Sequence, residues 1–260
     1  MKQISVLMTV YNTDKYLNES VNSILNQNYK NFEFVIVDDF STDKSREILK
    51  KYKNKKIKLF LLKKHIGRTP ALNFGLRKCK GKFIAILDSD DISSKNRLLK
   101  QINFFKENIN TQMVGTNTVL INEKGKKIKN FYIPQDNKEF NKEMIFNNYL
   151  PHSSVMFRKN FLSKIGNCYP KDYTYSQDYA LMLKFLKKSK IYVLPFNLTK
   201  SRVLKNNMTN SKKLKIVREI DIIKNNLFSL KNFDLTIPER LFLKYLIIKR
   251  VLKIFYKSIL

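Results

Sequence analysis

Cysteine, glycine and proline are all scarce in this sequence of 260 residues, and each shortage excludes a class of protein. The 2 cysteines, Cys79 and Cys168, form no Cys-x-x-Cys pair and have no neighbouring histidine. We therefore expect reduced, structural thiols, as in a cytosolic protein, rather than a disulfide scaffold or a cysteine metal site. With only 6 glycines and 6 prolines against 43% hydrophobic residues, the chain predicts a folded core without a long disordered linker.

Long uncharged apolar runs are also missing. The first residues, MKQISVLMTVYN, contain too short an apolar run for a secretory signal, and no stretch is long enough to cross a bilayer. We therefore expect the protein to stay on the cytosolic side of the membrane.

Acidic residues are few, and the charge balance is strongly positive. The chain has 21 Asp and Glu against 51 Lys and Arg, a formal net charge of +30. Such a charge indicates either nucleic acid or an anionic membrane surface as a partner. The many Lys and Asn residues also fit an AT-rich genome, which weakens both inferences.

The first 90 residues alternate between apolar runs and stretches with helical spacing. The apolar runs, typical of buried strands, cover 4–10, 32–37, 57–62 and 83–87. The intervening helical patterns lie within 11–29, 41–52 and 71–79. This alternation predicts a parallel α/β sheet whose faces are covered by helices.

Polar side chains follow three of these strands. They form the groups Thr9 to Asn12, Asp38 and Asp39, and Asp88 to Asp91. Because ligands bind beyond the carboxyl ends of parallel strands, we expect the three groups to converge along one edge of the sheet.

The carboxylates after the fourth strand are crowded, which is costly unless a cation lies among them. The Asp88-Ser89-Asp90 sequence suits a hard divalent cation, Mg²⁺ or Mn²⁺, held by oxygen ligands. The alternative is that these aspartates only cap the next helix and face solvent.

After residue 92 the alternation is less regular. We expect a helix at 97–108, a hairpin at 113–133, a strand leading into a helix at 153–166, a helix at 176–190 and strands at 191–203. The last sixty residues are helical in pattern and basic, with fourteen Lys or Arg and four Asp or Glu. We divide the chain into residues 1–209 and a basic helical extension, 210–260.

The last helix of this extension is amphipathic at about 100° per residue. Its expected apolar face holds Ile247, Ile248, Val251, Leu252, Ile254, Phe255 and Ile259. Its expected basic face holds Lys249, Arg250, Lys253 and Lys257. A helix of this kind can lie in an anionic membrane surface. Packing on the rest of the chain, or on a second subunit in a homo-oligomer, is the alternative.

Six segments, in this order, resemble the family-2 glycosyltransferases, inverting enzymes with the GT-A fold that use nucleotide-diphosphate sugars. They are ISVLMTVYN, FEFVIVDDFSTDKS, HIGRTPALNFGLRKCKGKFIAILDSDD, PHSSVMFRK, SQDYALMLKF and SRVLKNNMT. The resemblance runs from Ile4 to Thr209. It implies a GT-A catalytic domain over 1–209, with a Rossmann-like, mostly parallel central sheet and flanking helices.

The resemblance also implies a donor site. Its expected residues are Thr9, Tyr11, Asp38, Asp39, Arg68, Asp88, Asp91 and Arg202. Thr9, Tyr11 and Asp39 would contact the base, with Asp38 nearby, and Arg68 would line the diphosphate. Asp91 would orient the sugar or acceptor. Arg202 and Asn206 would belong to a loop that closes over the diphosphate.

For the reaction itself, the resemblance implies a metal and a general base. Asp90 and Asp88 would hold Mn²⁺ or Mg²⁺, and Asp178 would deprotonate the acceptor hydroxyl. Many relatives carry a histidine where this chain has Leu204, which leaves a third metal ligand unassigned. His65 occupies a position where relatives often have asparagine, and we expect His152 to be structural or to orient the acceptor.

The implied function is transfer of a hexose or N-acetylhexosamine from a nucleotide-diphosphate sugar to a surface glycan or glycolipid. A UDP-sugar is the donor we favour. We place it at the inner face of a bacterial inner membrane. The alternatives are a non-catalytic nucleotide-sugar-binding protein and a basic nucleic-acid-binding protein. No helix-turn-helix, zinc-finger or aromatic-basic signature accompanies the charge, so we do not expect nucleic acid as a partner.

Overall fold

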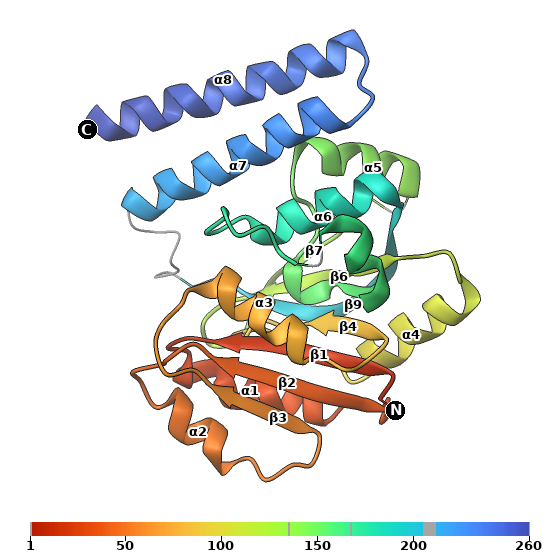
Figure 1. Cartoon of the computed structure of the whole chain (residues 1–260), viewed down its shortest axis with the longest axis vertical. Helices are drawn as coiled ribbons and strands as arrows, with labels where there is room; N and C mark the ends of the chain where they lie inside the picture. Colours follow the sequence, from red (N-terminus) through yellow and green to blue (C-terminus); the bar gives the residue numbers. More distant parts are fainter. Residues whose placement is uncertain (1, 135, 167, 205–211, 260) are drawn as a thin grey trace.

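The structure is a computed structural model that describes residues 2–134, 136–166, 168–204 and 212–259. One sheet crosses the described part of the chain in the order β3-β2-β1-β4-β8-β6-β9-β5, with β7 paired to β6 (Figure 1). The strands are β1 (Ile4–Val10), β2 (Phe32–Asp38), β3 (Ile57–Leu61), β4 (Phe83–Ile86), β5 (Ile92–Ser93), β6 (Met113–Ile121), β7 (Lys127–Phe131), β8 (Met156–Arg158) and β9 (Ile191–Arg202).

The first four strands form the parallel sheet that their apolar runs predict. β1 pairs in parallel with β2 and with β4, and β2 pairs in parallel with β3. The second half of the sheet is mixed, because β8 runs antiparallel to both β4 and β6, whereas β9 is parallel to β6. The carboxyl ends of β1, β2 and β4 therefore lie along one edge, as predicted.

Helices cover both faces of the sheet. α1 (Asp14–Leu25), α2 (Ser45–Lys51) and α4 (Arg97–Glu107) share one core with Val6 and Met8. α3 (Arg68–Lys78) and α6 (Gln177–Lys188) share the other core with Leu7. Successive side chains of a strand point to opposite faces, so β1 supplies both cores.

The remaining helical elements are α5 (Asn137–Phe146), η1 (His152–Ser154), η2 (Lys159–Ile165), α7 (Lys212–Asn232) and α8 (Ile237–Ile259).

Several of these elements and boundaries differ from the prediction. The hairpin β6–β7 forms as predicted, with Gly125 in its turn at φ 76°. The helix expected after β8 is the 3₁₀ segment η2, α3 begins three residues before Ala71, and α5 was not predicted.

The C-terminal helices α7 and α8 form a pair above α5 and α6 (Figure 1). α7 docks on the segment before α6, because Asp221 Oδ2 accepts hydrogen bonds from the amides of Thr174 and Tyr175 at 2.8 and 2.7 Å. The boundary predicted between 209 and 210 lies outside the described residues. Within the described ranges, no helix combines the length and the apolar character needed to cross a membrane.

The apolar face predicted for α8 is only partly correct. Ile247 and Ile254 are half-buried on the side toward α7, whereas Ile248, Val251 and Leu252 are exposed. The basic face is also interrupted, because Arg250 is half-buried on α7. The helix therefore has apolar residues on two sides.

Candidate active site

The polar ends of β1, β2 and β4 meet, which confirms the predicted convergence. Asn12 N donates to Ser41 Oγ at 3.1 Å, joining the ends of β1 and β2. Thr13 Oγ1 donates to Ser89 Oγ at 3.0 Å, joining the ends of β1 and β4. Asn12 and Phe40 adopt left-handed φ values of 52° and 64°. Such backbone strain in residues other than glycine is characteristic of functional loops.

Asp39 and Asp38 have different surroundings. Asp39 accepts hydrogen bonds from the amides of Ile66 and Gly67 at 2.8 and 2.9 Å, so it anchors the loop before α3. Asp38 is fully buried and pairs with Arg46 at 2.8 Å. Asp38 therefore braces the site from inside the protein.

An aromatic platform lies beside Asp39. The rings of Tyr11 and His65 stack with their centroids 4.2 Å apart, and His65 Nδ1 lies 2.9 Å from Asp39 Oδ2. Tyr11 keeps 37% of its surface exposed. Thr9, near the end of β1, is half-buried, so this corner offers both a flat ring and polar groups.

Arg68 stands at the start of α3 and links α3 to the acidic end of β4. Its Nη2 donates to Asp88 Oδ1 at 2.7 Å, and His152 Nδ1 lies 3.4 Å from the same carboxylate oxygen. His152 Nε2 lies 2.9 Å from the hydroxyl of Tyr169, which holds the buried imidazole in place. Burial opposes ionisation of Asp88, but Arg68 and His152 outweigh it and hold the pKa of this carboxyl below its usual range.

The three carboxylates after β4 are electrostatically distinct. Burial, and next the negative charge of Asp88, raise the pKa of Asp90 to about 6. Burial first, and then the charges of Asp90 and Asp88, raise the pKa of Asp91 well above its usual range. The end of β4 therefore concentrates negative charge that the described protein groups only partly neutralise.

Asp91, expected to orient the sugar or acceptor, is almost fully buried. It is 7% exposed, and its oxygens accept hydrogen bonds from Arg202 N at 2.8 Å and from Ser153 Oγ at 2.5 Å. In this conformation Asp91 ties the end of β9 and the η1 segment to the acidic cluster.

Arg202, expected in a loop over the diphosphate, is held by contacts within the protein. It donates to the backbone oxygen of Asp90 at 2.9 Å and to Glu19 Oε2 at 2.6 Å, and its guanidinium lies over the Tyr16 ring. The side chain is only 1% exposed. Asn206, predicted in the same loop, lies outside the described residues.

Asp178 lies in the first turn of α6 and faces this cluster. The charge of Asp88 above all, and then those of Asp178 and Asp90, outweigh burial and raise the pKa of Arg68. Asp88, Asp90 and Asp178 therefore all lie near enough to this guanidinium to act on it electrostatically. Asn148 Nδ2 donates to Asp178 Oδ2 at 3.4 Å, and the capping position, Ser176, makes no side-chain cap.

Asp88 and Asp90 are the carboxylates that could hold a divalent cation. Among the described residues, no group of three or more His, Cys, Asp or Glu forms a metal-binding cluster. Mg²⁺ and Mn²⁺ nevertheless bind through one or two carboxylates when water and substrate phosphates fill the remaining positions. The partly uncompensated charge at Asp90 fits such an open site, with no third protein ligand assigned.

Several contributors to the site were not predicted. Asn148, Ser153, Tyr169 and Glu19 each contact a predicted residue, yet none belongs to a strand end. Only Ser153 fell within a segment that the resemblance singled out. The others are brought in by tertiary packing.

Sequence comparison places the chain among known proteins. Residues 5–166 match the family described as glycosyl transferase family 2. The chain is 39% identical over 194 residues to the O-antigen biosynthesis glycosyltransferase WbnJ of Escherichia coli, covering 72% of this chain and 73% of the relative. It is 34% identical over 186 residues to an uncharacterized glycosyltransferase of Methanocaldococcus jannaschii, covering 70% of this chain and 63% of that protein.

Solved structures share the fold. A crystal structure of S. aureus TarS residues 1–349 matches with a TM-score of 0.72 and 20% identity, covering 95% of this chain and 71% of that solved chain. The mannosyltransferase PcManGT of Pyrobaculum calidifontis, solved with GDP-Man and Mn²⁺, matches with a TM-score of 0.67 and 15% identity, covering 96% and 73%. These matches confirm the GT-A fold. The chain is therefore a glycosyltransferase that belongs to glycosyl transferase family 2.

Proposed function

We propose that this glycosyltransferase moves a hexose or N-acetylhexosamine from a UDP-sugar to a hydroxyl of a growing surface glycan or glycolipid. The observation that carries the proposal is the pairing of Arg68 with Asp88 at 2.7 Å where the polar strand ends meet, at a position where Asp90 and Asp178 also act on Arg68 electrostatically. The E. coli relative named for O-antigen biosynthesis and the TarS structure with UDP-GlcNAc support this class of donor and acceptor.

The donor nucleotide would lie between the ends of β1 and β2. The Tyr11–His65 stack offers a ring face to the base, while Thr9 and Asp39 offer polar partners. Arg68 would contact the diphosphate, since its guanidinium is half-exposed beside Asp88. Asp38, Asp91 and Arg202 would hold the loops of the donor site in place, because their side chains make buried contacts within the protein.

Asp88 and Asp90 would hold the divalent cation. When bound, Mn²⁺ or Mg²⁺ would neutralise the charge that develops on the departing nucleoside diphosphate. Arg68, paired with Asp88, would add a fixed positive charge on the same side.

Asp178 would act as the general base. A carboxylate held by Asn148 in the first turn of α6 can accept the proton of an attacking hydroxyl. The hydroxyl would attack the anomeric carbon opposite the diphosphate as the sugar–phosphate bond breaks. This single displacement inverts the anomeric configuration.

Metal-dependent donor binding tests the proposal. A panel of nucleotide sugars is titrated by calorimetry with Mn²⁺ and with EDTA, using the parent protein and the Asp90→Ala variant. Binding should weaken strongly in EDTA and in Asp90→Ala, whereas Asp234→Ala, which removes an exposed carboxylate of the C-terminal region, should bind as the parent does. Unchanged donor binding both in EDTA and in Asp90→Ala would refute the metal assignment.

A further inference from the structure

α8 is fixed against the rest of the protein along one side. Leu243 is fully buried in a small core with Phe146 and Leu235. Farther along the helix, Arg250 Nη1 donates to Glu219 Oε2 of α7 at 2.8 Å, and Lys253 pairs with the same carboxylate. The rotation of α8 about its own axis is therefore set by these contacts.

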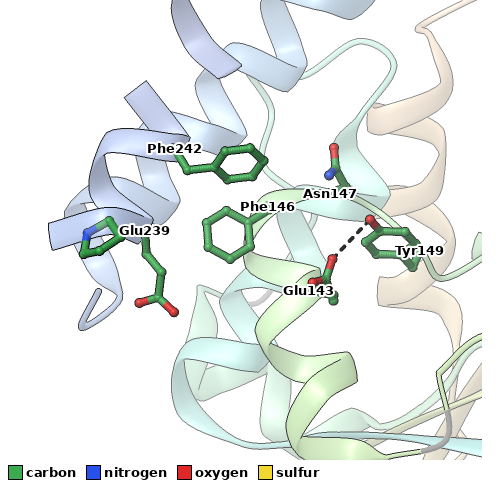
Figure 2. Close-up of a pocket in the computed structure, with 7 residues that line it drawn as sticks. Glu143, Phe146, Asn147, Tyr149, Glu239 and Phe242 are labelled. Atoms are coloured by element: carbon green, nitrogen blue, oxygen red, sulfur yellow. Dashed lines mark hydrogen bonds between the residues drawn. The ribbon is translucent and has the colours of Figure 1, made fainter. Parts of the chain in front are cut away.

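The first turns of α8 are held in the same way. Figure 2 shows the ring of Phe242 beside Phe146 at a hollow of about 390 Å³ between α5 and α8, and the two centroids lie 5.7 Å apart. Glu239 pairs with Lys142 of α5 at 2.7 Å. The start of α8 is thus anchored on α5, while its later turns are anchored on α7.

The side of α8 that faces away from these contacts is apolar. Leu241, Tyr245, Ile248 and Leu252 are spaced by four, three and four residues, which places them within an arc of about 60° on a helix. Their exposed fractions lie between 52% and 60%. An exposed apolar stripe of this length on a protein surface is typical of an interaction site. These four residues are called the outer stripe below.

Positive charge borders the outer stripe on both sides. Lys244 lies beside one edge and Lys249 beside the other, and both are exposed. From Arg240 to Ile254 the sequence contains five Lys or Arg and no Asp or Glu. Long lysine side chains can lay their methylene stems on an apolar surface while their ammonium groups stay in water.

We propose that the outer stripe docks on an anionic lipid surface, with α8 lying in the plane of the membrane. An apolar stripe with a lysine beside each edge suits lipid, because acyl chains would cover the stripe while anionic headgroups pair with the lysines. A second copy suits it less well, since two such faces would bring like charges together on chains that each carry a net charge of +30. The inference does not depend on the reaction at Asp178.

The position of α8 agrees with this assignment. Figure 1 shows α8 as an outermost layer, separated from the sheet by α7, α6 and α5. The helix could therefore enter the headgroup region without disturbing the sheet that carries the active site.

Co-flotation of the full chain with vesicles tests the inference. Vesicles of phosphatidylcholine alone are compared with vesicles that also contain phosphatidylglycerol, at low and high salt. The variant Leu241→Gln/Ile248→Gln removes two residues of the outer stripe. The control Ile109→Gln/Ile128→Gln removes two exposed apolar side chains from other elements. Circular dichroism checks that each variant is folded, and analytical ultracentrifugation measures its mass.

We expect the parent to float with phosphatidylglycerol vesicles, to float weakly with phosphatidylcholine alone, and to be released by salt. The outer-stripe variant should partition at least about tenfold less, since burying even one aliphatic side chain contributes a factor of about ten or more. The control should match the parent. A folded outer-stripe variant that partitions like the parent would overturn the inference. So would a parent dimer that the variant converts to monomer without any vesicle binding.

Discussion

At the scale of single residues, three aspartates within four positions of the chain differ in their surroundings and in their pKa values. Asp88 stays ionised beside Arg68, Asp91 is buried among hydrogen-bond donors, and Asp90 keeps a pKa of about 6. Only Asp90 combines a raised pKa with a place on the half-exposed side of the cluster. It is the carboxylate whose charge a cation would compensate most.

This difference predicts how a metal should affect stability at different pH values. The raised pKa means that protonation of Asp90 favours the metal-free fold, and this stabilisation is lost as the pH rises through about 6. Mn²⁺ competes with that proton, so its effect should grow over the same interval. The shift in melting temperature caused by Mn²⁺ should be small at about pH 5 and large at about pH 8. Asp90→Asn should show no shift at either pH, and a parent shift independent of pH would contradict the assignment.

Residue patterns predicted part of this site and missed the rest. Asp88, Asp90 and Asp39 could be placed together because parallel strands bring their carboxyl ends to one edge, whereas Arg68 was placed there only by the family resemblance. The partners of Asp91 and Arg202 could not, because Arg202 at the end of β9 contacts Asp90 and Asp91, which lie more than a hundred residues earlier in the chain. Those contacts depend on the mixed half of the sheet, which local patterns do not specify.

At the scale of elements, α3 carries Arg68 to the site by packing very closely on the sheet. Gly75 lies against β1 so tightly that an added Cβ would lie 2.3 Å from Leu7 Cδ1 and 3.2 Å from Val37 Cγ2. A side chain at this position would force the buried Leu7 side chain out of its place or move α3 away from the strands.

The variant Gly75→Ala should therefore destabilise the protein and weaken donor binding together. Overpacking in a core costs roughly 1–3 kcal/mol, and a shifted α3 would move Arg68 away from Asp88. Urea unfolding and nucleotide-sugar titration measure the two effects. Arg77→Ala, on the exposed side of the same helix, should change neither quantity appreciably. Unaltered stability in Gly75→Ala would show that α3 is not held by this contact.

Helices and strands were predictable where the hydrophobic pattern of the sequence matches the burial of the residues. The strands β1 to β4 are short apolar runs separated by helices, and all four form as predicted. α5 was missed although Asp136 and Glu139 mark its start, where Asp136 Oδ1 accepts a hydrogen bond from Glu139 N at 2.8 Å. For α8, apolar residues occur on both sides of the helix, so hydropathy alone could not decide which side faces α7.

At the scale of the whole molecule, the site exists only when distant segments assemble. β4 supplies Asp88 and Asp90, α3 supplies Arg68, and α6 supplies Asp178. Asn148 reaches Asp178 from the segment after α5. Donor binding at the sheet edge and proton removal at α6 therefore depend on different elements, and a single variant can distinguish them.

The most direct test is Asp178→Asn, with donor affinity and the initial rate of sugar transfer measured on the same folded preparation. Asparagine keeps the shape and the hydrogen-bonding oxygen but cannot serve as a general base. Donor affinity should stay close to that of the parent, while transfer should fall by about 10²–10⁴-fold. Asp172→Asn, an exposed carboxylate before the same helix, should retain both activities. If Asp178→Asn transfers sugar at close to the parent rate, Asp178 is not the general base and another residue removes the proton.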